Sequence, residues 1–215
     1  MKDTIFEGST TPLTSWFTLI YEFANSKKGI SAMETQRRLG VTYKTAWRMC
    51  KQIRSIMKDD QHDLLSGIVE MDESQIGGKK NKNKFYIFGM VERGGRARVK
   101  IVRDRPSGKE LLPIIKANVS REAKVYTDKY GAYIGLEKEG YYHRSINHKQ
   151  SYAFKNGIST NRIEGFWSLF KNSILGTHRS VTRKWLQHYL DEFTFRYNRR
   201  REGSTFHELL GRVGI

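Results

Sequence analysis

The chain has 215 residues and a net charge of +17, which indicates a polyanionic partner, nucleic acid in the first place and a membrane surface in the second. Its longest apolar runs are far shorter than the ~18 residues that span a bilayer, and no secretory signal pattern opens it. The single cysteine, Cys50, excludes an intrachain disulfide and a structural zinc site built from cysteines. We therefore expect a cytoplasmic protein that binds DNA and has no membrane partner.

The first predicted helix begins at Pro12 and ends at residues 27–29, where two lysines and a glycine follow the apolar pattern. Cations and a glycine are typical of a helix C-terminus. Residues 1–11 are polar, and we expect them to be poorly ordered.

Two further helices are predicted, separated by a single glycine. Ser31 and Glu34 have the spacing of a capping box, which predicts a helix that runs to Leu39. Gly40 supplies a tight turn, and Thr42 caps a third helix whose apolar residues recur three or four positions apart.

This helix, turn and helix are typical of a helix-turn-helix, although an ordinary helical hairpin has the same pattern. In a helix-turn-helix the second helix lies in the major groove of DNA, and residues at its start contact the bases. The side chains expected to contact DNA are Tyr43, Lys44, Thr45 and Arg48.

A polar segment at 59–63 separates helical from strand-like periodicity. We therefore expect a helical DNA-binding region at 1–62 and a catalytic domain at 63–215. The strands predicted for the second domain lie at 67–71, 84–91, 97–102, 124–127 and 142–145. Its helices are predicted around 111–116, at 130–138, around Glu164 and at 182–199.

Three antiparallel strands, a helix, a parallel strand and further helices follow the element order of the ribonuclease-H-like fold. We expect an α/β protein with a ribonuclease-H-like mixed sheet flanked by helices, and with an N-terminal helix-turn-helix region. In such a sheet the first strand and the strand after the crossover are neighbours. Asp72 and Asp128, which follow these two strands, should therefore converge.

The predicted helix at 161–171 has two faces when its residues are placed about 100° apart. Its polar face carries Asn161, Glu164, Ser168 and Lys171. A single Glu on a helix is usually a solvated surface residue. Here 35 residues separate it from Asp128, and Asp72 and Asp128 both follow apolar runs, so we interpret the three carboxylates as one metal-binding cluster.

Carboxylates of this kind are suited to Mg²⁺, which prefers hard oxygen ligands and keeps several waters. Two such ions about 4 Å apart promote phosphodiester cleavage. Asp72 would bridge both ions, Asp128 would hold one and Glu164 the other, and Mn²⁺ could substitute. Lys171 would contact a phosphate, and Asn161 would orient a ligand or a DNA end.

Competing chemistries have less support in the sequence. Cys50 lies on the apolar face of a predicted helix, which favours a place in the core over a nucleophilic role. A zinc site built from histidines is possible but has no support, because His143, His148 and His178 are scattered along the sequence.

Positive charge is concentrated between residues 75 and 125, which hold 14 Lys or Arg against 4 Asp or Glu. A lysine run is usually a solvated loop, but beside an acidic metal cluster it favours contact with DNA phosphates. The lysines expected to follow the backbone are Lys79, Lys80 and Lys82.

The chain resembles the ISXO-type insertion-sequence DDE transposases in several blocks that occur in order. These are GISA at 29–32, RLGVTYKTAW at 38–47, MDESQIGGK at 71–79, VYTD at 125–128, NRIEGFWS at 161–168 and YLDEFTFRYNRR at 189–200. The resemblance covers nearly the whole chain. It departs from the family in one respect, because many members begin with a four-cysteine zinc ribbon that this sequence does not contain.

The resemblance implies a ribonuclease-H-like DDE core that acts with Mg²⁺ on the double-stranded ends of a bacterial insertion sequence and on target DNA, as a homo-oligomer. The catalytic acids of the family fall on Asp72, Asp128 and Glu164. Asn161 remains a rival for the third place, because some relatives are assigned an asparagine there. Two alternatives stay open, a nuclease that stops after hydrolysis and a DNA-binding regulator with a decayed core.

Overall fold

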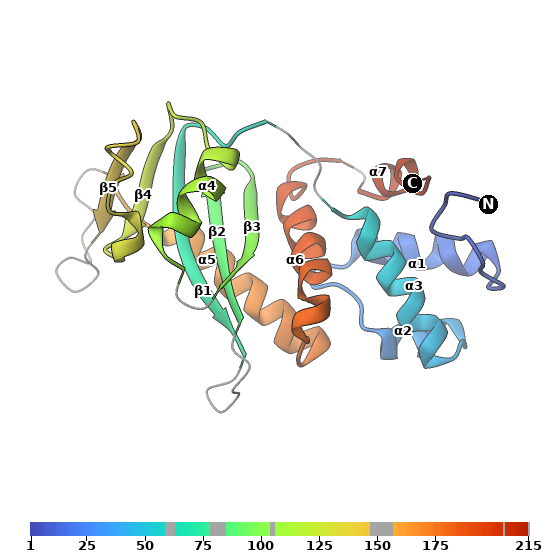
Figure 1. Cartoon of the computed structure of the whole chain (residues 1–215). Helices are drawn as coiled ribbons and strands as arrows, with labels where there is room; N and C mark the ends of the chain where they lie inside the picture. Colours follow the sequence, from blue (N-terminus) through green and yellow to red (C-terminus); the bar gives the residue numbers. More distant parts are fainter. Residues whose placement is uncertain (59–62, 78–84, 104–105, 147–156, 204, 215) are drawn as a thin grey trace. The chain divides into compact units, whose positions relative to one another are not determined.

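The computed structural model describes residues 1–58, 63–77, 85–103, 106–146, 157–203 and 205–214 (Figure 1). The chain forms two compact units, Met1–Asp60 with Asn172–Ile215, and Gln61–Lys171. The expected division at about residue 62 lies close to the first boundary. The expected extent of the catalytic domain, 63–215, differs from the structure, because residues after 171 pack with the N-terminal helices.

The first unit is helical. Its N-terminal elements are α1 Leu13–Asn25, α2 Ala32–Leu39 and α3 Tyr43–Ile56. Its C-terminal elements are a short π-helical turn, Ile174–His178, followed by α6 Arg183–Asn198 and α7 Thr205–Gly211. Phe195 of α6 and Leu209 of α7 share one buried cluster with Trp16 and Ile20 of α1, so both ends of the chain complete the same core.

The helix-turn-helix pattern of the sequence is present in α2 and α3. The Ser31 hydroxyl accepts the Glu34 backbone N–H, and the Thr42 hydroxyl accepts the Thr45 backbone N–H, so both predicted N-caps are confirmed. Gly40 adopts φ 64° at the C-terminus of α2, a left-handed conformation that glycine reaches without steric cost.

The expectation that residues 1–11 are poorly ordered is wrong. Ile5 and Phe6 are buried in the core of the helical unit, and the Ile5 N–H donates to the Val213 carbonyl. Two apolar side chains in a polar stretch were enough to anchor the segment, because the C-terminal helix offers them a partner that periodicity alone does not reveal.

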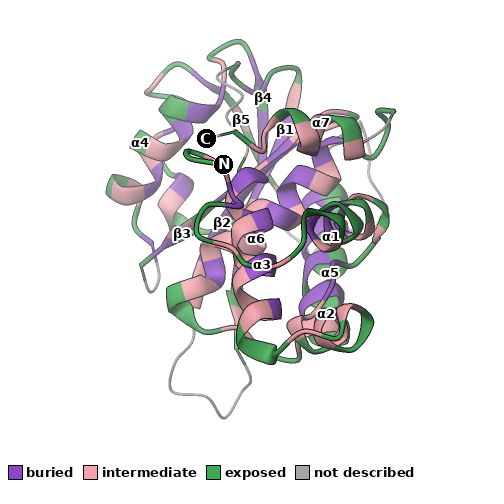
Figure 2. Cartoon of the chain, turned by 90° about the vertical axis from the view of Figure 1, so that its right-hand side faces the viewer, coloured by how far each residue is buried: buried purple, intermediate pink, exposed green. Residues whose placement is uncertain are grey.

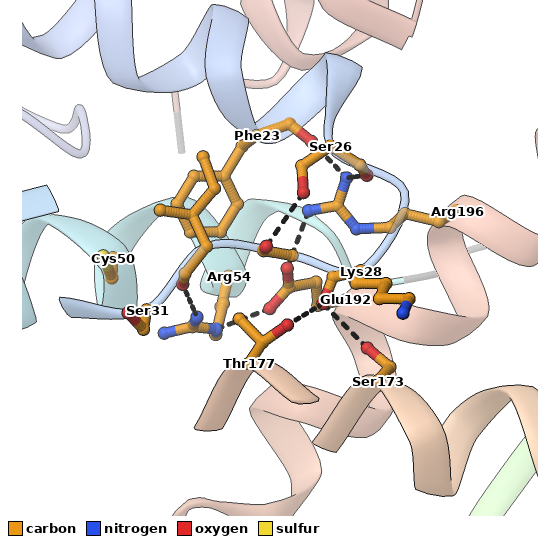
Figure 3. A network of polar contacts seen from close by, with 12 residues as sticks. Phe23, Ser26, Lys28, Ser31, Cys50, Arg54, Ser173, Thr177, Glu192 and Arg196 are labelled. Carbon is orange, nitrogen blue, oxygen red and sulfur yellow. Dashed lines mark hydrogen bonds and ion pairs between the residues drawn. The ribbon is translucent and has the colours of Figure 1, made fainter. Parts of the chain in front are cut away.

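A buried ion network joins α3, α6 and the loop after α1 (Figure 3). Glu192 accepts from Arg54 Nε at 2.6 Å and from Arg196 at 2.7 Å. Arg54 also donates to the Ile30 carbonyl, and Arg196 to the Ser26 carbonyl. Burial alone would raise the pKa of Glu192, but the two guanidinium groups outweigh it and lower the pKa to about 2.

The second unit is built on a five-stranded sheet in the order β3-β2-β1-β4-β5 (Figure 1). The strands are β1 Ile68–Ile76, β2 Phe85–Glu92, β3 Ala97–Val102, β4 Lys124–Asp128 and β5 Tyr142–Ile146. β1 is antiparallel to β2 and parallel to β4. This is the strand order and direction expected of a ribonuclease-H-like sheet, and the predicted fold class is confirmed.

Helices cover the two faces of this sheet. Residues at alternate positions of β1 point to opposite sides. Val69 and Met71 pack with Leu111 and Ile115 of α4 (Gly108–Asn118). On the other side, Glu70 and Asp72 contact α5 (Asn161–Ser173). Figure 2 shows the resulting run of buried residues along β1 and β2.

Two element predictions in this unit are wrong. The first strand does not end before Asp72 but continues to Ile76. It does so because β1 pairs with the whole length of β2, as far as Ile76 opposite Phe85. The helix expected at 130–138 is reduced to the 3-10 turn Gly131–Tyr133, because Gly135 has φ 104° and interrupts helical geometry.

Across the described ranges, no helix is both long and apolar enough to cross a membrane.

We expect Glu192→Gln to destabilise the protein by about 3–5 kcal/mol, because it leaves two buried guanidinium groups without a compensating charge. The pKa of Glu192 is lowered from 4.5 to about 2, so its contribution to stability is complete above pH 4.5 and is lost as pH falls towards 2. Urea unfolding of wild type and variant across this pH range measures both effects.

The control for this prediction is Glu137→Gln, which removes an exposed partner of Arg144. An exposed pair contributes little to stability, so this variant should unfold like wild type. Equal stability of Glu192→Gln and wild type at neutral pH would contradict the prediction.

Candidate functional site

Asp72 lies in the middle of β1, on the face that α5 covers. Its Oδ2 accepts a hydrogen bond from the indole Nε1 of Trp167 at 3.1 Å. Asp72 pairs with Gly89 across the sheet, where a Cβ would lie 2.5 Å from the Trp167 ring. The absence of a side chain at Gly89 therefore lets the indole lie against the sheet beside the carboxylate.

Asp128 is the last residue of β4, the parallel neighbour of β1. The register pairs Val69 with Val125 and Glu70 with Tyr126, so Asp128 follows on the same side of the sheet as Asp72. Its Oδ1 accepts the Tyr130 backbone N–H at 2.9 Å, which orients the carboxylate after the strand ends.

Glu164 lies in the first turn of α5. Its Oε1 accepts from the Thr160 hydroxyl at 2.8 Å. The apolar stripe of this helix is buried, with Ile163 at 0%, Trp167 at 4% and Phe170 at 1% exposure, while the polar face is exposed. The exposed residues of that face are Asn161, Glu164, Ser168 and Lys171.

The electrostatics of Asp72 report the proximity of the other two carboxylates. Burial and the charge of Asp128 raise the pKa of Asp72 from 3.8 to about 7, and Glu164 adds to the same shift. The negative charges of Asp128 and Glu164 disfavour ionisation of Asp72, and a cation bound beside Asp72 would relieve that repulsion. The strand adjacency from which we predicted that Asp72 and Asp128 converge is confirmed by the parallel pairing of β1 with β4.

The donor set fits a divalent cation in kind, because all three groups are carboxylates and each accepts a hydrogen bond that orients it. Within the described residues, no three His, Cys, Asp or Glu side chains lie close enough to coordinate a single ion. Asp128 is the larger of the two charges that act on Asp72, and Glu164 is the smaller. Neither His143 nor His178 belongs to a metal-binding group among these residues.

Sequence reasoning missed three residues that border the site. Trp167 was assigned to the core, where it lies, but its hydrogen bond to Asp72 was not foreseen. Glu70 lies two positions before Asp72, and this spacing in a strand could have indicated a shared face. Glu73 points to the other face, where burial raises its pKa to about 7 despite the opposing influence of Tyr133.

The predicted DNA-contacting residues of α3 fall into two groups. Tyr43 is 49% exposed, and Lys44 is also exposed at the start of the helix. The Thr45 hydroxyl instead bonds to that of Thr42. Arg48 donates to the Glu7 and Gly8 carbonyls, so it holds the N-terminal segment against α3.

An open hollow of about 440 Å³ adjoins the start of α3 within the helical unit. Tyr43, Trp47 and Trp185 line it, and Lys51 Nζ lies 4.7 Å from the centre of the Trp185 ring. Aromatic side chains from α3 and α6 with a lysine beside them suit a nucleic-acid surface. The predicted phosphate contacts Lys79, Lys80 and Lys82 lie outside the described residues.

The sequence profile of the ISXO2-like transposase domain matches residues 64–198. A protein in the transposable element ISH50 of Halobacterium salinarum is 26% identical over 216 residues, which cover 90% of this chain and 72% of that protein. A transposase-like protein of Haemophilus influenzae is 33% identical over 88 residues, covering 41% of this chain and 70% of that protein.

Among solved structures, the HTLV-2 integrase catalytic core domain in complex with magnesium is similar at a TM-score of 0.41 and 14% identity. This similarity covers 69% of the chain described here and 99% of the integrase chain.

The raised pKa of Asp72 predicts how the metal-free protein responds to pH. Because the folded state holds the Asp72 proton more tightly than the unfolded state, this contribution to stability is complete below pH 3.8 and is lost as pH rises through about 7. Between pH 5 and pH 8 the free energy of unfolding of wild type should therefore fall by about 1–3 kcal/mol relative to that of Asp72→Asn, since one pKa unit corresponds to about 1.4 kcal/mol.

Urea unfolding in the presence of a chelator measures this difference. Asp63→Asn is the control, because the Asp63 side chain is 88% exposed and its removal should give the same stability difference at both pH values. Parallel pH profiles for Asp72→Asn and wild type would show that Asp72 does not hold the proton.

Proposed function

The chain belongs to the ISXO2-like transposase family, and we propose that it cuts phosphodiester bonds at the ends of a bacterial insertion sequence and joins the freed 3′ hydroxyl to target DNA. The observation that carries this proposal is the pairing of Asp72 with Asp128 on one side of the sheet, where Glu164 also acts on the Asp72 pKa. Asp72 and Asp128 are both half-buried, and holding two partly desolvated carboxylates beside one another costs free energy. Such a cost is typical of an active site, where a bound metal ion would offset it.

We assign the role of metal ligands to Asp72, Asp128 and Glu164, which would hold Mg²⁺ through their carboxylate oxygens. When bound, Mg²⁺ would stabilise the charge that develops on the phosphate and lower the pKa of a coordinated water. Mn²⁺, which accepts the same oxygen ligands, would serve as a substitute.

The remaining side chains have positioning roles in this proposal. The Trp167 indole holds one oxygen of Asp72, and the Thr160 hydroxyl holds one oxygen of Glu164. Lys171 is exposed on the same face of α5 as Glu164, two turns along, where it would bind a phosphate of the DNA. Asn161, one turn before Glu164, would orient the DNA end or a coordinated water.

The partner of this site is proposed to be double-stranded DNA, both transposon ends and target, bound by a homo-oligomer. The net charge of +17 supports binding of a polyanion, and the exposed start of α3 offers Tyr43 and Lys44 to a major groove. The lysines at 79, 80 and 82 would add phosphate contacts. In this proposal the helical unit chooses the sequence and the sheet unit performs the chemistry.

A strand-transfer assay with labelled DNA from the ends of the element tests the proposal. Cleavage followed by joining to a target plasmid in Mg²⁺ is the expected result. Cleavage without joining would indicate a nuclease that stops after hydrolysis. Sequence-specific binding without cleavage in either Mg²⁺ or Mn²⁺ would indicate a DNA-binding regulator.

We expect Glu164→Gln to abolish cleavage and Asn161→Ala to reduce it only partially, because a neutral amide is a poorer ligand for Mg²⁺ than a carboxylate. Single-turnover cleavage of a labelled DNA end, in Mg²⁺ and in Mn²⁺, measures both rates. Ser168→Ala on the same helix face is the control and should cut like wild type. Normal cleavage by Glu164→Gln together with an inactive Asn161→Ala would transfer the third ligand to the asparagine.

We expect Lys44→Ala to weaken binding to the proper end sequence more than to random DNA, by about 1–3 kcal/mol if it contacts a base edge. Arg48→Ala should instead lower thermal stability, because its guanidinium holds the Glu7 and Gly8 carbonyls. Fluorescence anisotropy on both DNAs at one salt concentration, with thermal melts of both variants, separates the two roles. Equal losses of Lys44→Ala on both DNAs would assign it to the phosphate backbone.

A further inference from the structure

Glu70 is a carboxylate with 0% exposure, two residues before Asp72 on the same face of β1. Its Oε2 accepts the backbone N–H groups of Arg162 at 2.7 Å and Ile163 at 3.2 Å, both in the first turn of α5. A helix N-terminus has unsatisfied N–H groups and a positive dipole end, and a carboxylate from elsewhere in the fold satisfies both. Glu70 therefore caps the helix that carries Glu164.

Arg93, at the turn after β2, completes this arrangement. Its Nε donates to Glu70 Oε1 at 2.6 Å, while its other nitrogens donate to the Gly157 and Ser159 carbonyls and to the Ser159 hydroxyl. One guanidinium group thus ties the buried carboxylate to the segment that leads into α5. The entry to the helix and its first turn are both attached to the sheet through this ion pair.

A second link joins the same strand and helix, the hydrogen bond from Trp167 to Asp72. From Glu70 to Asp72 the strand advances about 6.6 Å at roughly 3.3 Å per residue. From residues 162–163 to Trp167 the helix advances about 6–7.5 Å at 1.5 Å per residue. The two advances are similar, so the two links together restrain where α5 lies along β1.

Glu70 is not itself available as a metal ligand in this arrangement. Oε1 is engaged by a guanidinium N–H and Oε2 by two backbone N–H groups. A cation at this place would lie against the positive end of a helix and a guanidinium group, which is electrostatically unfavourable. The buried carboxylate that resembles a fourth acid of the site therefore has another role.

We propose that Glu70 and Arg93 are positioning residues that set the axial position of α5 on β1, and thereby place Glu164 relative to Asp72. This inference rests on the proposed function, in which Glu164 is a metal ligand and must therefore lie close to Asp72. One strand then positions two of the three carboxylates, Asp72 directly and Glu164 through the cap on its helix.

The test uses Glu70→Gln in the full chain and two readouts, Mn²⁺ affinity by titration and the ¹⁵N–¹H resonance of the Trp167 indole. A glutamine keeps the length of the side chain but loses the charge that binds Arg93 and the helix N-terminus. We expect the Trp167 signal to shift and Mn²⁺ affinity to fall about 10–100-fold, as for other residues that support metal ligands.

A double-mutant cycle with Glu164→Gln separates positioning from simple loss of stability. If Glu70 acts through Glu164, the Glu164→Gln change should cost much less Mn²⁺ affinity in the Glu70→Gln background than alone. Leu111→Ala is the matched control, because it destabilises the same unit from the α4 face. It should leave the Trp167 signal and Mn²⁺ affinity as in wild type.

Arg93→Lys is the second variant if Glu70→Gln does not fold, because the Arg93 side chain is 24% exposed and a lysine keeps one charge beside Glu70. It should also shift the Trp167 signal, since a single ammonium cannot reproduce the three backbone and side-chain contacts. Wild-type Trp167 signals in both variants, or independent effects of Glu70 and Glu164 on Mn²⁺ affinity, would overturn the inference.

A different result, the Mn²⁺ affinity of Asp72→Asn, tests the proposed function independently of this inference. If Asp72→Asn alone leaves Mn²⁺ affinity unchanged, the metal site is wrong, and the Trp167 signal of Glu70→Gln still decides whether Glu70 positions the helix.

Discussion

The sheet unit depends on the attachment of α5 to one face of β1. Strand alternation places Glu70 and Asp72 on that face, and each accepts hydrogen bonds from the helix, Glu70 from its first turn and Asp72 from Trp167. The apolar stripe of α5 then buries itself against the sheet, next to a glycine that leaves room for the indole. Without this attachment the polar face of α5 would have no defined place beside the aspartates.

The acidic site is electrostatically costly, and the fold supplies the compensation. Burial and the neighbouring Asp128 raise the pKa of Asp72 to about 7, so the metal-free protein keeps part of this charge neutral near physiological pH. Glu70 is more deeply buried than Asp72, but Arg93 and the N-terminus of α5 surround it with positive charge. Two acids two residues apart on one strand thus differ in role because their environments differ.

The helical unit is organised by a different buried charge. Glu192 of α6 joins Arg54 of α3 and Arg196, and Gly29 approaches it so closely that a Cβ would lie 2.5 Å from its carboxylate oxygen. The C-terminal helix α6 is thereby joined to helix α3 of the N-terminal helix-turn-helix (Figure 3). The C-terminal residues 172–215 consequently belong with the helical unit in space, although they follow the sheet unit in sequence.

Local sequence signals by themselves determined the caps at Ser31 and Thr42, the strand order, the two faces of α5 and the nearness of Asp72 to Asp128. These features follow from periodicity, capping chemistry and strand adjacency, which act over a few residues or through one topological rule. Tertiary structure alone decided the place of Ile5, the capping role of Glu70 and the partners of Glu192. Each of these depends on residues between 92 and 208 positions apart, whose meeting no local pattern encodes.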